Sequence, residues 1–145
     1  MQDFPHHYQV SATAETTSHV ELRSEGLSPI ESAPPPEFGG PGDRWSPESL
    51  LVAAVADCFV LSFKAIAGAS RLEWNGIHCD VDGVLDKLDG KMRFTEFKVS
   101  ATLSVPNGTD QSKAARLLEK AEHACLITNS LIADRELTTK ITVAN

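Results

Sequence analysis

Alternating apolar and polar residues predict short strands at the start of the chain. Tyr8 to Thr16 alternates in this way, and Val20 to Gly26 is expected to be its antiparallel partner. A further short strand is expected from Leu27 to Ser32. The next stretch, Ala33 to Pro47, is rich in proline and glycine, which forbids regular structure. Loops of this make-up within a compact domain are often functional.

A long apolar helix is predicted after this loop. Ser46 is a favourable N-cap, Pro47 suits the first helical position, and Glu48 lies in the first turn, where the helix dipole favours a carboxylate. The helix is expected to continue to about Gly68. Its apolar residues surround most of its circumference, which is typical of a buried helix. One chain of this size has little with which to cover every side, which indicates a second subunit.

The second half of the chain is predicted to hold a hairpin, two helices and a last strand. "GIHCDVDGVLDKL" and "RFTEFKVSATLSVP" both alternate, and the "DGK" near their junction is a hairpin signal. An amphipathic helix is expected from Asp110 to Cys125, a short helix within "LITNSLIAD", and a strand from Glu136 to Asn145. This order predicts an α+β fold with mostly antiparallel sheets and a long central helix. Residues 1–145 are expected to form a single domain.

Composition narrows the possible partners and the compartment. The 145 residues carry a net charge of −7 with no basic patch, so no nucleic-acid partner is expected. The first residues lack the pattern of a signal peptide. Asp57 and Lys64 interrupt the long apolar helix, so no membrane span is expected either. Three cysteines are an odd number, unlike a secreted disulfide framework, and a cytoplasmic protein with free thiols is expected.

The cysteines are the main candidates for chemistry. Cys58 lies in the apolar helix, where it is either a small packing residue or a reactive thiol. Cys125 lies at a helix boundary, where backbone N–H groups can support a thiolate. Two separated cysteines can act as a nucleophile and a resolving thiol. Cys79 shares a strand face with apolar residues and is predicted to belong to the core.

Two charged residues near the helix start have open interpretations. Glu48 precedes Cys58 by ten residues, which is about 15 Å of rise on a straight helix, so the two cannot touch directly. Glu48 either serves the helix dipole alone or meets Cys58 through a bent start, a bridging cation or a second copy. Arg44 is either a surface residue or a guanidinium that pairs with Glu48 and lowers a nearby thiol pKa.

Metal binding has little support in the sequence. The candidate ligands are His78, Cys79 and Asp80, or His123 with Cys125. Neither set supplies four well-spaced ligands. No metal and no cofactor are therefore expected.

Two motifs carry a resemblance to a known family. "SPESLLVAAVADCF" and "KAEHACLITNSL" resemble the two signatures of the OsmC/Ohr family of thiol-dependent hydroperoxide reductases. "EFGGPGDRWSPE" is similar to the glycine-rich lead-in of that family. The resemblance runs over nearly the whole chain and marks a divergent member. It implies the OsmC-like α+β fold, an intertwined homodimer with two long central helices packed between sheets.

The resemblance also implies a reaction, the thiol-dependent reduction of organic hydroperoxides in oxidative-stress defence. Cys58 would be the peroxidatic thiolate, Cys125 the resolving thiol, and Glu48 the carboxylate that orients a catalytic arginine. The resulting disulfide would be reopened by a dithiol reductant. An apolar substrate pocket is expected near the thiol, formed by Trp45, Phe59 and Phe63.

Two departures from the family pattern are visible. The hydroperoxide-resistance branch carries an arginine in its first hairpin turn, but this turn, "ETTSHVEL", has none. Arg44, in the loop before Glu48, is the expected substitute, and Arg23 is the alternative. Leu126 stands where the family usually has proline. The alternative function is a dimer of the same fold that binds a small apolar ligand without peroxidase turnover.

Overall fold

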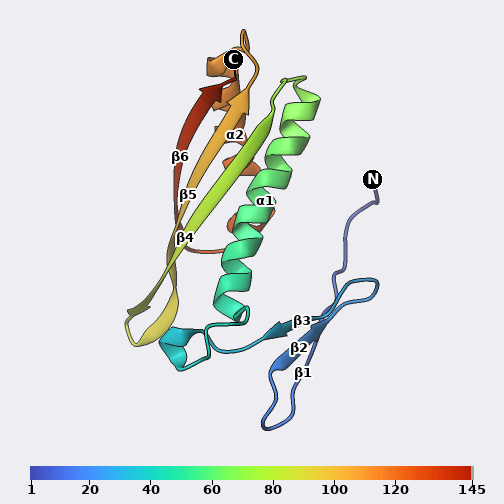
Figure 1. Ribbon diagram of the computed structural model, residues 1–145, viewed down its shortest axis with the longest axis vertical. Helices are drawn as coiled ribbons and strands as arrows, with labels where there is room; N and C mark the ends of the chain where they lie inside the picture. Colours follow the sequence, from blue (N-terminus) through green and yellow to red (C-terminus); the bar gives the residue numbers. More distant parts are fainter. Residues whose placement is uncertain (145) are drawn as a thin grey trace. The chain divides into compact units, whose positions relative to one another are not determined.

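A computed structural model describes residues 1–144, and their contacts define two compact units. The first unit is Met1–Leu51, and the second begins at Val52. Each unit contains one three-stranded sheet, formed by β1–β3 in the first and by β4–β6 in the second (Figure 1). The expectation of a single domain stays a prediction.

The first unit is built on a short antiparallel meander. Its strands are β1 (Ser11–Thr13), β2 (Val20–Arg23) and β3 (Ile30–Ser32). The third strand is confirmed, whereas the first two are shorter than the alternating pattern predicts. The pattern extends beyond the residues that find a partner strand, because β1 pairs with β2 only from Ser11 to Thr13.

The loop after β3 folds back on itself. A short 3₁₀ turn, η1 (Pro36–Phe38), lies within it. The N–H of Ala33 donates to the carbonyl of Trp45 at 2.9 Å, which closes the loop. A Cβ on Gly40 would lie 1.5 Å from the carbonyl oxygen of Pro34, so only glycine fits there. This closure brings Trp45 beside the end of β3.

Helix α1 (Pro47–Ala69) begins and ends as its sequence predicts. The N–H of Ser49 donates to Ser46 Oγ at 3.1 Å, and the N–H of Ser46 donates to Ser49 Oγ at 2.8 Å. This reciprocal pair satisfies free donors at the helix start and confirms Ser46 as the cap. Beyond the other end of α1, Lys113 Nζ donates to the carbonyl of Ser70 at 2.8 Å.

The sheet of the second unit combines a hairpin with one parallel strand. The hairpin strands are β4 (Gly76–Leu88) and β5 (Lys91–Val105), joined by a turn in which Asp89 and Gly90 have φ of 50° and 77°. This is the two-residue hairpin turn that the sequence predicts. Strand β6 (Asp134–Val143) pairs with β5 in parallel, and Asn145, expected to end it, lies outside the described residues.

Two helices make the crossover that a parallel pair requires. They are α2 (Gln111–Ala124) and α3 (Leu126–Asn129), which lie between β5 and β6 in the chain. The side chain of Asp110 caps α2 by accepting from the N–H of Lys113 at 3.0 Å. The fold is therefore α+β as expected, with three antiparallel strand pairs and one parallel pair.

The core of the second unit lies between one face of its sheet and its helices. The buried residues of β5 alternate along the strand: Phe97, Val99, Ala101, Leu103 and Val105. The buried residues of α1 are spaced four apart: Val55, Phe59, Phe63 and Ala67. The buried residues of α2 form one face: Ala114, Leu117, Leu118 and Ala121. The opposite face of the sheet carries exposed polar residues, such as Lys98 and Ser100.

Much of α1 remains uncovered in one chain. By length and composition alone, the helix could cross a membrane. Only 22% of its most apolar 18-residue segment is buried within the chain. Leu61 is 55% exposed in the middle of the helix. An apolar helix left this open leaves an apolar surface that another body can cover. The absence of a membrane span stays a prediction.

We expect Gly83→Ala to destabilise the second unit by about 1–3 kcal/mol, because an added methyl overpacks a filled site. A Cβ at Gly83 would lie 2.7 Å from Val52 Cγ2 and 3.1 Å from ring atoms of Phe94 and Phe97. Urea unfolding measures the loss. The control is Gly76→Ala in the same strand, where an added Cβ meets no atom within 4 Å. Equal stability of the two variants would contradict this packing.

Candidate functional site

Cys58 lies on the edge of the buried stripe of α1. Its neighbour Phe59 is fully buried, whereas Cys58 itself is partly exposed. One turn later, Ser62 Oγ lies 4.0 Å from Cys58 Sγ. Cys58 therefore lies at the border of the core and not deep within it, unlike a fully buried core cysteine.

Cys125 occupies the break between α2 and α3. Its backbone is extended, with φ −63° and ψ 106°, so it ends α2 and precedes the first residue of α3. The residue is only 2% exposed. Its sulfur lies 3.1 Å from Thr128 Oγ1, which is also buried. The break frees the first N–H groups of α3, because the initial donors of a helix have no partner within it.

The two cysteines face each other with opposite shifts in pKa. Burial raises the pKa of the Cys58 thiol, but donors opposite its sulfur outweigh burial, so the net pKa is lowered. In order of effect, these donors are the N–H of Ile127, the thiol of Cys125, the hydroxyl of Ser62 and the N–H of Leu126. Both cysteines are free thiols.

The pKa of the Cys125 thiol is shifted in the opposite direction. Burial raises the pKa of the Cys125 thiol, and its hydrogen bond and charge interaction with Cys58 raise it further, against the lowering effect of Thr128. A sulfur with the higher pKa keeps its proton and donates it, and the sulfur with the lower pKa accepts. The pair therefore favours a Cys58 thiolate next to a Cys125 thiol.

Cys79 is a third thiol, on the inner face of β4. It pairs in register with the buried Ala101 of β5 and is itself partly buried. Burial first, then the charges of Asp80 and Cys125, raise the pKa of Cys79 to about 11. A thiol with this pKa stays protonated at neutral pH. This agrees with the core role that the sequence predicts for Cys79.

The acidic and basic candidates lie in the first unit. Arg44 Nε lies 3.0 Å from Glu31 Oε2, and Arg44 Nη1 lies 3.0 Å from Asp43 Oδ2. Glu48 Oε2 is buried and has no hydrogen-bond partner within residues 1–144. A buried carboxylate oxygen without a donor is costly and calls for a partner. The roles of Glu48 and Arg44 in catalysis stay predictions.

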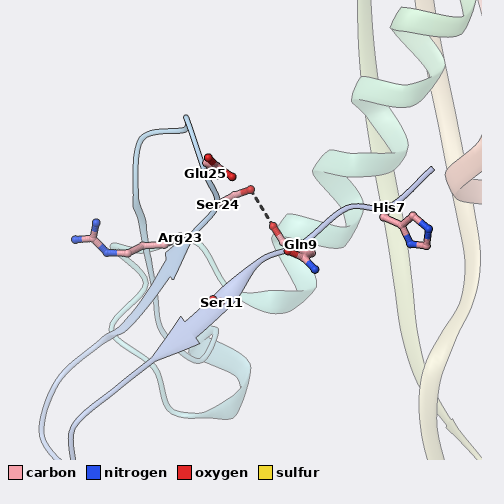
Figure 2. Close-up of a pocket in the computed structure, with 6 residues that line it drawn as sticks. All are labelled: His7, Gln9, Ser11, Arg23, Ser24 and Glu25. Carbon is pink, nitrogen blue, oxygen red and sulfur yellow. Dashed lines mark hydrogen bonds between the residues drawn. The ribbon is translucent and has the colours of Figure 1, made fainter. Parts of the chain in front are cut away.

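Arg23, the alternative cation, also lies in the first unit. It pairs with Glu21 on the same strand, and its side chain is 64% exposed. Figure 2 shows its guanidinium directed away from His7, which lines the same open cavity of about 750 Å³. Within this cavity, Ser24 Oγ donates to the carbonyl of Gln9 at 2.9 Å. The lining is polar and contains no cysteine.

The three predicted pocket residues differ in exposure. Trp45, in the first unit, is 51% exposed. Phe59 and Phe63 are fully buried, and the ring of Phe63 meets Trp74 edge-on with centroids 5.5 Å apart. Packing alone accounts for both phenylalanines. Their part in a substrate pocket stays a prediction.

The possible metal ligands lie apart. His78 and Asp80 point to the outer face of β4, where His78 Nε2 lies 3.1 Å from Asp80 Oδ2, while Cys79 points inward. The ring of His123 instead meets the carbonyl of Glu119 at 2.9 Å. Within the described part of the chain, no group of three or more His, Cys, Asp or Glu side chains converges on one point.

Several residues of the site are not evident from the sequence. They are Ser62, Thr128 and the N–H groups of Leu126 and Ile127. Ser62 follows Cys58 by one helical turn, and that spacing is the only local signal for it. The helix boundary at Cys125, with its free N–H groups, is expected from the sequence, whereas the approach of Leu126, Ile127 and Thr128 to the two sulfurs depends on tertiary packing.

The sequence is similar to those of OsmC-like proteins. The sequence profile described as OsmC-like protein matches residues 40–141. The chain is 29% identical over 106 residues to an organic hydroperoxide resistance protein of Xanthomonas axonopodis pv. citri (strain 306), covering 72% of each. It is 29% identical over 89 residues to peroxiredoxin OsmC of Escherichia coli (strain K12), covering 61% of this chain and 62% of that protein.

Solved structures show the same fold. An OsmC-like protein of unknown function from Vibrio cholerae superposes with a TM-score of 0.83 at 21% identity, covering 95% of this chain and 100% of that one. An organic hydroperoxide resistance protein from Elizabethkingia anophelis gives a TM-score of 0.77 at 18% identity, covering 99% and 100%. At these identities the likeness shows the OsmC-like fold.

We expect iodoacetamide to alkylate Cys58 at a lower pH than Cys79, because the thiolate reacts and the thiol does not. The pKa of Cys58 is lowered and that of Cys79 is raised to about 11. As the pH is reduced, the alkylation rate of Cys58 should therefore fall at a lower pH than that of Cys79. Leu126→Pro removes one N–H donor and should move the Cys58 midpoint to higher pH. Mass spectrometry of the alkylated peptides measures both rates.

Leu126→Ala is the matched control, since it keeps the N–H and should leave the midpoint in place. Proline is acceptable at this position, because Leu126 opens α3 and the backbone of Cys125 is already extended. Equal midpoints for the proline and alanine variants would show that the Leu126 N–H has no effect on Cys58.

Proposed function

Because this chain belongs to the OsmC-like protein family, we propose that it reduces organic hydroperoxides with Cys58 as the peroxidatic thiolate. Cys125 is the resolving thiol in this proposal. One observation carries it: a cysteine of lowered pKa faces a second cysteine of raised pKa. Two relatives named for peroxide chemistry, peroxiredoxin OsmC and the organic hydroperoxide resistance protein, support the reaction class.

The first step is attack of the Cys58 thiolate on the terminal oxygen of the hydroperoxide. The S–O bond forms as the O–O bond breaks, which leaves Cys58 sulfenic acid and an alkoxide that takes a proton from solvent. The position of Cys58 at the border of the core, where the residue is only partly buried, supports access for the peroxide. Donors that hold the thiolate lower the pKa of Cys58, so a larger share of this thiol is ionised at a given pH.

The second step resolves the sulfenic acid. The sulfur of Cys125 attacks the sulfur of Cys58, the S–S bond forms, and the hydroxyl of the sulfenic acid leaves with the Cys125 proton as water. A dithiol reductant then reduces the disulfide with its two thiols and ends as a disulfide itself. The thiol form of Cys125 in the resting state supplies the proton of this step.

The proposal includes a cation near Glu48. Its buried, unpartnered oxygen supports a role in receiving a guanidinium, and Arg44 is the first candidate. Arg44 would then exchange its present carboxylates, Glu31 and Asp43, for Glu48. Without that exchange, the hydrogen-bond donors around Cys58 support the thiolate alone.

The proposal also includes a homodimer in the cytoplasm. Its support is α1, whose apolar surface is mostly uncovered in one chain. A second copy of the same helix would cover it, which would shield Leu61 and the other apolar side chains of its open face.

We expect Cys58→Ser to abolish peroxide consumption with an organic hydroperoxide and a dithiol reductant, a loss of at least about a hundredfold. Cys125→Ser should consume one equivalent of peroxide and then stop, provided that the dithiol reductant cannot itself reduce the sulfenic acid of Cys58. Cys79→Ser is the control and should turn over like the natural chain, because the Cys79 thiol stays protonated. Coupled peroxide assays measure all three.

Undiminished turnover of Cys58→Ser would overturn the assignment of the nucleophile. A natural chain that forms no sulfenic acid with any peroxide would instead favour the alternative, a dimer that binds a small apolar ligand without turnover.

We expect light scattering to give twice the chain mass of 15.7 kDa for the natural protein. Leu61→Glu should give the single-chain mass, because it puts a charge on the uncovered apolar face of α1. Lys64→Glu is the control, since it places the same carboxylate at an exposed position that is already charged. A single-chain mass for the natural protein at micromolar concentration would contradict the dimer.

A further inference from the structure

Arg135 makes hydrogen bonds to residues on both sides of Cys125, the non-helical residue between α2 and α3. It lies on β6, in register with the fully buried Phe97 of β5. Arg135 Nε donates to Glu122 Oε1 at 2.5 Å, and Arg135 Nη1 donates to Asn129 Oδ1 at 2.6 Å. A third bond runs from Arg135 Nη2 to the carbonyl of Glu122. One guanidinium therefore holds the end of α2 and the end of α3 together.

The bonds of Arg135 are joined by others that close the same turn. The carbonyl of Glu122, which Arg135 binds, also accepts from the N–H of Cys125 at 3.3 Å. Asn129 Nδ2 donates to the carbonyl of His123 at 3.1 Å, and the N–H of Asn129 donates to the carbonyl of Cys125 at 3.0 Å. The segment from 122 to 129 is thus bracketed by one arginine and one asparagine.

The ion pair between Arg135 and Glu122 is largely screened from solvent, so its hydrogen bonds can hold the turn in place. The side chain of Arg135 is 26% exposed and that of Glu122 is 13% exposed. Charged hydrogen bonds of this kind, made by the planar fork of a guanidinium, fix orientation as well as distance. Surface ion pairs, by contrast, contribute little.

We propose that Arg135 is a positioning residue for the thiol site: it holds the α2–α3 turn so that Cys125 and the N–H groups of Leu126 and Ile127 face Cys58. The proposal rests on the proposed function, because the turn carries the resolving cysteine. Arg135 acts through the turn, not through contact with substrate. It bears on both steps, the readiness of the Cys58 thiolate and the approach of Cys125 to the sulfenic acid.

The geometry gives a reason for each effect. If the turn loosens, the N–H groups no longer point steadily at Cys58, and the thiolate loses donors that support it. The sulfur of Cys125 also leaves its fixed place, and disulfide formation requires a narrow range of distances between the two residues. The S–S bond then forms more slowly although both sulfurs are intact.

The test compares three variants of the chain with one control variant. Arg135→Met removes the fork and keeps much of the apolar stem, and Arg135→Lys keeps the charge without the fork. Asn129→Ala removes the side-chain hydrogen bonds of Asn129 to His123 and Arg135. It replaces Arg135→Met in the test if that variant fails to fold. Lys113→Met is the matched control, because Lys113 makes a comparable bond to the carbonyl of Ser70 at the opposite end of α2.

Two readouts separate positioning from general stability. The first is the pH dependence of Cys58 alkylation. The second is the rate at which Cys58 sulfenic acid converts to disulfide after one equivalent of cumene hydroperoxide, followed by adding dimedone to samples taken over time to label the sulfenic acid that remains. For Arg135→Met we expect a higher alkylation midpoint and disulfide formation at least tenfold slower. Arg135→Lys should be intermediate, and Lys113→Met should match the natural chain in both, even where it unfolds at lower temperature.

Overturning results are equally distinct. If Arg135→Met and Asn129→Ala keep the natural midpoint and a disulfide rate within twofold, Arg135 does not position the site. If Lys113→Met changes both readouts as Arg135→Met does, the effect is one of general stability. A natural chain that never forms sulfenic acid refutes the peroxidase, but the alkylation midpoint still tests Arg135.

Discussion

The site depends on the break in the helical path at Cys125. An uninterrupted helix through α2 and α3 would bond the N–H groups of Leu126 and Ile127 to earlier carbonyls. The extended backbone of Cys125 prevents this and leaves those donors opposite Cys58. The same break places the Cys125 sulfur beside Thr128, and the shielded bonds from Arg135 to Glu122 and Asn129 hold the break closed.

This arrangement supports a thiolate with dipoles and a neighbouring thiol. None of the groups that lower the pKa of Cys58 within residues 1–144 is a cation. Leu126 contributes an N–H at a position where proline would have none, and this links its identity to the support of Cys58. The burial of Cys125 has a related effect, because it raises the pKa of that thiol and so favours its protonated form.

Elements whose start or turn is determined by a few neighbouring residues could be predicted from the sequence. Ser46 was correct as the helix cap, and the turn at Asp89 and Gly90 was correct as the hairpin. The parallel pairing of β6 and the short extent of β1 escaped prediction, because both depend on which strand lies alongside in three dimensions. Arg135 escaped for the same reason, since its partners lie on other elements. The sequence singles out Cys58 and Cys125 as candidates, whereas the directions of their pKa shifts follow from packing.

The proposed chemistry requires that Cys58 and Cys125 form one redox pair, apart from Cys79. Peptide mapping by mass spectrometry, after one equivalent of organic hydroperoxide and without reductant, tests it most directly. We expect a single disulfide between Cys58 and Cys125, with Cys79 recovered as a free thiol. A disulfide that includes Cys79, or oxidation of Cys125 with Cys58 left reduced, would contradict it.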